Sequence, residues 1–167
     1  GYRDTYQQWQ NDPEAYWLDQ ASAISWDKAP TKALFERGND LFEWYADAQV
    51  NTCYNAVDRH VENGRADQVA IIHDSPITGT TTKITYAELQ TRVASLAGAL
   101  VAQGITKGDR VIIYMPMVPE ALEAMLACAR IGAVHSVVFG GFAANELAGR
   151  IDDCTPKAII AASCGLE

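Results

Sequence analysis

The stretch that decides the fold is residues 109–141, DRVIIYMPMVPEALEAMLACARIGAVHSVVFGG. Two apolar runs rich in β-branched residues, 111–114 and 136–139, flank a longer segment. In that segment apolar side chains recur every three or four positions, at Leu122, Met125, Leu126 and Ala129. A spacing of this kind predicts a helix with one apolar face. The stretch is therefore expected to form a strand, a helix and a second strand.

The ends of this helix carry their own signals. Pro119 suits the first helical turn, where its missing N–H costs nothing, and Glu120 there meets the positive end of the helix dipole. Gly132 can adopt the left-handed conformation that ends a helix. Two uncharged strands joined in this way are usually parallel and buried on both faces. The second strand leads into Gly140 and Gly141, at the edge where an open α/β sheet meets its ligand.

Four further elements are predicted upstream. A helix begins at residues 51–52 and closes at Gly64, with an apolar side and a solvated face. The apolar side comprises Tyr54, Val57 and Val61, and the solvated face comprises Asp58, Arg59 and Glu62. Strands 69–73 and 83–85 are expected to pair across a turn-rich loop. Thr85 and Glu88 form a capping box that opens another helix. Its apolar stripe comprises Leu89, Val93, Leu96, Leu100 and Val101, and Gly104 closes it.

Downstream, residues 142–153 predict a helix, with Leu147 and Ile151 on one face. Ala143 and Ala144 offer no side-chain cap at its start, which leaves its first N–H groups without an obvious protein partner. Residues 157–162, KAIIAA, predict a third buried strand. The order of strands and helices is that of a doubly wound α/β sheet, in which right-handed crossovers are expected.

The N-terminal part, residues 1–50, is rich in aromatic side chains. Asp12 and Pro13 form a good helix start. In residues 28–40 the apolar side chains show no regular spacing, so this segment is interpreted as an irregular strap without helix or strand. We expect this part to lie across the body of the protein, anchored by its Trp and Tyr side chains. An aromatic surface that stacks on a ligand is the functional alternative.

The composition excludes several classes of protein. The formal net charge is −8, with 21 acidic and 13 basic residues, which argues against a nucleic-acid or anionic-membrane surface. The longest uncharged run, 131–145, is shorter than the roughly 20 residues that a membrane span needs. The four cysteines show no C-x-x-C spacing, so we expect free, buried thiols in a reducing compartment and no zinc site. Each histidine is expected to be packed or solvated.

Known catalytic and nucleotide-binding motifs are absent from the sequence. It contains no Walker phosphate loop, no G-x-G-x-x-G fingerprint, no G-x-S-x-G elbow and no H-E-x-x-H. What remains is Phe139-Gly140-Gly141, between a strand and an uncapped helix. The two glycines could let backbone approach an anion or a polar tail closely. Alternatively, they only make a tight left-handed turn, and the spacing does not separate these two hypotheses.

The longest motif, YMPMVPEALEAMLACARIGAVHSVVFGGF, resembles the N-terminal part of the AMP-forming short-chain acyl-CoA synthetases. NTCYNAVDRHVENG resembles the end of that family's N-terminal extension, and KITYAELQTRVASLAGAL with GDRVIIYMP resembles the start of its adenylate-forming domain. The resemblance implies a mostly helical extension at 1–65 and a partial doubly wound sheet of the adenylate-forming fold at 66–167. GRIDDCTPKAII and SCGLE are more similar to the propionyl-CoA synthetase branch than to the acetate branch.

The resemblance also implies a reaction. In this family a carboxylate attacks the α-phosphate of ATP–Mg to give an acyl-adenylate and pyrophosphate, and coenzyme A then displaces AMP. The phosphate loop, acyl pocket, ribose-binding Asp and catalytic Lys lie beyond Glu167 in family members, so no catalytic residue is assigned here. Phe139, Gly140 and Gly141 match a segment that borders the coenzyme A path. Glu167 matches a coenzyme A-contacting position where many acetate enzymes have Arg, and a carboxylate cannot pair with a phosphate there.

From this resemblance we expect the fragment of a propionate–CoA ligase, or alternatively of an acetate–CoA ligase. Small-molecule substrates and a cytoplasmic location follow, with the mitochondrial matrix as the alternative. The fragment itself is expected to be inactive, and to self-associate through sheet edges left uncovered beside 111–114 and 157–162. Two hypotheses of other classes stay open. One is a small, non-catalytic module that binds coenzyme A or a nucleotide, and the other is an NAD-type dehydrogenase domain, which the missing glycine fingerprint disfavours.

Overall fold

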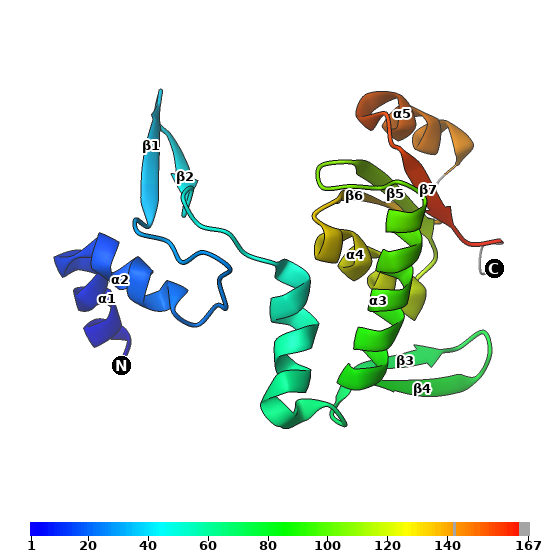
Figure 1. Cartoon of the computed structure of the whole chain (residues 1–167), viewed down its shortest axis with the longest axis horizontal. Coiled ribbons are helices and arrows are strands. Elements are labelled where there is room, and N and C mark those ends of the chain that lie inside the picture. Colours follow the sequence, from blue (N-terminus) through cyan, green and yellow to red (C-terminus); the bar gives the residue numbers. More distant parts are fainter. Residues whose placement is uncertain (142, 164–167) are drawn as a thin grey trace. The chain divides into compact units, whose positions relative to one another are not determined.

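The computed structural model describes residues 1–141 and 143–163 of the chain (Figure 1). The chain divides into two compact units, Gly1–Asn51 and Thr52–Glu167. The first unit contains two helices and a hairpin. The second contains a helical segment, a second hairpin and a three-stranded sheet with its helices.

In the first unit, helix α1 (Tyr2–Asn11) is followed directly by α2 (Pro13–Ala21). The predicted start of α2 is confirmed, because the carboxylate of Asp12 accepts a hydrogen bond from the N–H of Ala15 at 3.0 Å. Two aromatic side chains of different elements, Trp17 and Trp44, meet edge to face with their ring centroids 5.3 Å apart. Aromatic contacts therefore hold much of this unit together.

The interpretation of residues 28–40 as an irregular strap is wrong for its second half. Strands β1 (Leu34–Gly38) and β2 (Leu41–Trp44) form an antiparallel hairpin. The turn between them uses three consecutive residues with positive φ, namely Gly38 at 81°, Asn39 at 52° and Asp40 at 58°. Gly and Asn are the residues that tolerate this conformation best, and Asp is also enriched in it. The Gly-Asn-Asp triplet was therefore a signal for this hairpin.

The sheet of the second unit follows the prediction in its order and direction. Strands β5 (Arg110–Met115), β6 (Val134–Phe139) and β7 (Ala158–Ala161) are parallel and lie in the order β6-β5-β7. Helix α4 (Pro119–Ile131) joins β5 to β6, and α5 (Ala144–Cys154) joins β6 to β7. Figure 1 shows α5 on the opposite side of the sheet from α4. Crossing from one side to the other is what defines a doubly wound sheet.

Burial within this sheet is less complete than the sequence predicted. Val111, Ile112 and Ile113 of β5 are fully buried. The outer strands are only partly covered, because Val137 of β6 and Ile159 of β7 are 49% and 45% exposed. The expectation that a strand is lacking beside 111–114 is also wrong. β5 has a partner on each side, and the open edges belong to β6 and β7.

The ends of α4 confirm the prediction, and its apolar face is confirmed in part, since Leu126 and Ala129 pack against the core. Pro119 opens the helix, and Gly132 ends it in the left-handed conformation with φ of 73°. Leu122, which was assigned to the apolar face, is 38% exposed. The most deeply buried positions are Glu123, Ala124, Ala127 and Cys128. Three of these have small side chains, which allow α4 to lie close to its neighbours.

The N-terminal hairpin of the second unit comprises β3 (Val69–Ser75) and β4 (Thr80–Thr85), which pair antiparallel as predicted. Helix α3 (Tyr86–Ala102) begins at the predicted capping box. The N–H of Thr85 donates to Glu88 Oε2 at 2.8 Å, and the N–H of Glu88 donates to Thr85 Oγ1 at 3.3 Å. The prediction that Val101 belongs to the apolar stripe of this helix is wrong, because Val101 is 53% exposed.

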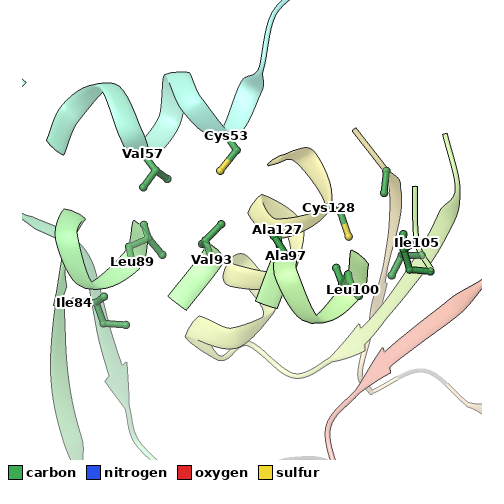
Figure 2. Packing of buried hydrophobic residues seen from close by; sticks show 12 residues of the cluster. Cys53, Val57, Ile84, Leu89, Val93, Ala97, Leu100, Ile105, Ala127 and Cys128 are labelled. Atoms are coloured by element: carbon green, nitrogen blue, oxygen red, sulfur yellow. The ribbon is translucent and has the colours of Figure 1, made fainter. Parts of the chain in front are cut away.

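The main core lies between α3, α4 and the helical segment 52–65, which contains the π-helical turns η1 (Tyr54–Asp58) and η2 (Val61–Arg65) (Figure 2). The predicted apolar side of this helical segment is confirmed at Val57, which is fully buried. The prediction that Asp58 lies on the solvated face is wrong. Asp58 is only 7% exposed and contacts α3 and α4.

Candidate functional site

The predicted site lies at the carboxyl edge of the three-stranded sheet. β5 ends at Met115, β6 at Phe139 and β7 at Ala161, and parallel pairing brings these ends to one edge. The chain moves from β5 outward to β6 and then crosses back to β7, so the strand order reverses here. A crevice at such a reversal is where open α/β sheets bind ligands.

The two glycines after β6 do not form a left-handed turn. Neither Gly140 nor Gly141 is among the residues with positive φ. At Gly140 a Cβ atom would lie 2.8 Å from the carbonyl carbon of Met115 and 2.9 Å from the nitrogen of Pro116. At Gly141 it would lie 2.7 Å from Cε1 of the Phe139 ring. Gly140 is therefore required for the close approach of two backbone segments, which the sequence alone did not indicate.

The side chains around these glycines are apolar and partly exposed. Phe139 is 55% exposed and Met117 is 80% exposed. Helix α5 begins at Ala144, and its N-cap residue Ala143 supplies no side-chain cap, as predicted. No Lys or Arg occurs in residues 111–129, 131–149 or 158–163, which include the three strand ends at this edge. The residues present therefore fit a neutral or apolar portion of a ligand and do not supply the charges that phosphates need.

The amino edge of the same sheet has the opposite character. Asp109 Oδ2 accepts hydrogen bonds from the N–H of Thr106 at 2.7 Å, its Oγ1 at 2.8 Å, and Lys157 Nζ at 2.9 Å. These donors, Lys157 first, lower the pKa of Asp109 to about 2. Lys157 also donates to the carbonyl of Gly104 at 2.6 Å. This cluster ties the start of β7 to the turn before β5, because Lys157 donates to two acceptors of that turn.

The histidine and cysteine side chains do not converge on the carboxyl edge of the sheet. His135 lies on β6 near its amino end. Cys53 and Cys128 are buried, Cys154 is half-buried, and all three are free thiols. Among the described residues no group of His, Cys, Asp and Glu could hold a metal ion. Within the same part of the chain, no helix has the length and hydropathy needed to cross a membrane. Glu167 lies outside the described residues.

The first unit presents an aromatic groove of its own. One hollow of about 340 Å³ and another of about 440 Å³ share Trp9 and Trp17. Their walls are otherwise formed mainly by apolar side chains, at Tyr2, Tyr6, Tyr16, Pro13, Leu34 and Trp44. Of the described residues in this unit, only Ala21 and Ala33 are fully buried hydrophobic side chains. The aromatic residues thus remain largely at the surface instead of forming a core.

Comparison with known families accounts for nearly the whole chain. Residues 57–166 match the AMP-binding enzyme family, and residues 2–56 match the acetyl-coenzyme A synthetase N-terminus family. The first match alone covers more than half of the chain. The chain belongs to the AMP-binding enzyme family. The resemblance noted in the sequence is thereby confirmed, together with the α/β adenylate-forming class of its fold.

Individual relatives of the chain include named synthetases. The chain is 54% identical over 156 residues to acyl-CoA synthetase short-chain family member 3, mitochondrial, of Bos taurus. The aligned residues cover 93% of this chain and 23% of the relative. The chain is 49% identical over 169 residues to the acetyl-coenzyme A synthetase of Parvibaculum lavamentivorans, covering 99% of this chain and 26% of the relative. An uncharacterized Pseudomonas aeruginosa protein, PA3568, is 57% identical over 156 residues. The chain spans about a quarter of the length of these relatives.

Proposed function

We propose that the chain is the N-terminal part of an AMP-forming short-chain acyl-CoA synthetase that makes propionyl-CoA from propionate, ATP and coenzyme A. The supporting observation is the pair of consecutive family matches, 2–56 and 57–166. A synthetase N-terminus joined to the start of an AMP-binding enzyme is the arrangement expected of such a ligase. ATP and coenzyme A follow from this family, and Mg is part of the same proposal.

Within this ligase, Phe139, Gly140 and Gly141 are proposed to border the path of coenzyme A. The supporting features are the exposed ring of Phe139 and the backbone of the two glycines, which suit the uncharged pantetheine portion. Coenzyme A supplies the thiol that receives the acyl group. The phosphates would be held by basic residues outside these segments, since 111–129 and 131–149 contain none. Glu167 is proposed to lie near the same path.

Propionate is proposed over acetate because two motifs, GRIDDCTPKAII and SCGLE, are more similar to the propionyl-CoA synthetase branch than to the acetate branch. The full-length gene product should be purified and its AMP release measured with each acid in turn. A higher kcat/KM with propionate than with acetate is expected, and the reverse order would leave the acetate ligase as the function.

The site residues require a separate measurement on the same full-length protein. Phe139→Ala should raise the KM for coenzyme A and leave pyrophosphate release in the first half-reaction unchanged. Met125→Ala on α4 is a control of similar size that does not lie at the carboxyl edge. Equal loss of both half-reactions in Phe139→Ala would place the residue in the scaffold and remove it from the coenzyme A path.

The 167-residue chain alone is proposed to be inactive. The groups that carry the chemistry in the proposed family are absent from it, since it has no phosphate loop. Incubating it with ATP, propionate and coenzyme A should release no AMP above a no-protein blank. Release of AMP would support a complete small enzyme. Saturable binding of coenzyme A without turnover would favour the alternative of a non-catalytic module.

We further propose a cytoplasmic location, with the mitochondrial matrix as the alternative. Bacterial relatives support the first, and the word mitochondrial in the name of the Bos taurus relative supports the second. Self-association of the fragment is also proposed, through the open edges of β6 and β7. Light scattering at several concentrations distinguishes an associating fragment from a monomer.

A further inference from the structure

The helical segment 52–65 is held on the second unit by a buried ionic contact. Asp58 is 7% exposed, and its two carboxylate oxygens accept hydrogen bonds from Nη2 of Arg130 at 2.9 and 2.8 Å. Gln90 Nε2 donates to the same carboxylate at 2.8 Å. Arg130 lies in the last turn of α4 and Gln90 lies on α3, so a single side chain ties this segment to both helices.

Apolar contacts surround this ion pair. Cys53 and Val57, on the same side of the segment, are fully buried against the core (Figure 2). Burial alone would lower the pKa of Arg130, but hydrogen bonds to Asp58 and the charge of that carboxylate outweigh burial, so the pKa is raised. Hydrogen bonding and apolar burial thus act on the same face of the segment.

The segment 52–65 has little intrinsic stability as an isolated helix. Two of its turns, η1 and η2, have the π pattern, which is rare and usually limited to single turns. Asn63 and Gly64 have non-helical backbone angles, with φ of −85° and 77°. A helix of this length is marginal in isolation, so its order depends on docking.

We propose that residues 52–65 form a docking helix, latched onto α3 and α4 by Asp58 and Arg130, and that loss of the latch releases this helix as a local unit while the sheet stays folded. Removing Arg130 leaves Asp58 as a buried charge without its ion pair, and removing Asp58 takes the ion pair from Arg130, whose side chain is 25% exposed. Undocking returns the remaining charge to water, so the variant favours local opening over complete unfolding. Residues 52–56, which match the synthetase N-terminus family, belong physically to this helix.

Hydrogen exchange on the whole 167-residue chain tests the latch. Asp58→Asn is expected to speed exchange at least tenfold in peptides covering 53–62, and to change exchange in β5 less than twofold. Arg130→Met should give the same pattern. Arg92→Met is the matched control, because Arg92 and Glu123 also join α3 to α4, at 3.2 Å, by an ion pair that does not involve residues 52–65. It should leave peptides 53–62 as protected as in the parent.

The double variant Asp58→Leu/Arg130→Met completes the test. It removes both charges, so exchange in 53–62 should return toward the parent rate. Three results would overturn the proposal. These are unchanged exchange in both single variants, an equal acceleration in 53–62 and in β5, and a selective release of 53–62 by Arg92→Met.

Discussion

Gly140 lies directly against the backbone of Met115, so closely that a Cβ atom there would be 2.8 Å from the Met115 carbonyl carbon. Gly140 follows β6, and Met115 is the last residue of β5. Register pairing of Met115 with Phe139 brings the two segments together at the carboxyl edge. The glycine therefore has a structural cause that is independent of any ligand.

Gly140→Ala should destabilise the second unit by about 1–3 kcal/mol, because a backbone atom cannot move aside as a side chain can. Urea denaturation of both proteins measures the difference. Gly98→Ala on α3 is the control. Nothing lies within 4 Å of its added Cβ, and it should be neutral or stabilising by up to about 1 kcal/mol. A Gly140→Ala chain as stable as the parent would contradict the close contact.

The lowered pKa of Asp109 should make the folding stability of the chain depend on pH in the acid range. The pKa of Asp109 is lowered to about 2 in the folded state, chiefly by the hydrogen bond from Lys157. A lowered pKa adds stability above the ordinary value of about 3.9, and this stability is lost as pH falls toward about 2. Asp109→Asn should therefore be less stable than the parent at pH 7, and the difference should shrink between about pH 4 and pH 2. Thermal melts across this range provide the measurement.

The control for Asp109 is Asp152→Asn, which removes an exposed carboxylate on α5. It should not reproduce the loss of stability at pH 7. If the difference between Asp109→Asn and the parent stayed constant from pH 7 to pH 2, the ionic contact with Lys157 would not be its cause.

The capping box of α3 has a measurable contribution. Thr85→Ala removes the acceptor for the N–H of Glu88 and should cost about 1 kcal/mol, within a range of about 0.5–2 kcal/mol. Thr91→Ala, in the same helix, removes a hydroxyl that donates only to the carbonyl of Ala87. That control should be neutral or slightly stabilising, since alanine is the better helix former. Equal losses in the two variants would argue against the cap.

Thiol labelling should follow burial. Burial raises the pKa of Cys53 and of Cys128, so each forms less of the reactive thiolate at neutral pH. Cys154 is half-buried. Iodoacetamide should therefore modify Cys154 well before Cys53 and Cys128, as read by peptide mass spectrometry. Early modification of Cys53 would show that the docking helix opens in the parent chain as well.

Much of the local structure could be predicted from short stretches of sequence. Asp12, Thr85 and Gly132 start or end helices where expected, because each satisfies or accommodates backbone groups within its own turn. The alternation of strands and helices after residue 110 also follows from local apolar spacing. The family resemblance was visible at this level too, since it rests on contiguous motifs.

The candidate site was only partly predictable. Phe139, Gly140 and Gly141 were placed at the carboxyl edge correctly, because the end of a parallel strand has a known position in such sheets. The reason for Gly140 was missed, since its neighbour Met115 belongs to another strand. The hairpin on either side of residues 38–40 was not predicted, because the apolar spacing of its two short strands is too irregular to indicate a strand.

The sequence by itself determined the order of the elements, their caps and the family, because these depend on residues close together along the chain. Tertiary structure alone decided that β5 is central, that Leu122 faces outward and that Asp58 is buried. Asp58 looks like a surface residue among its sequence neighbours. Its partners Gln90 and Arg130 lie 32 and 72 positions away, and only folding brings their donors to its carboxylate.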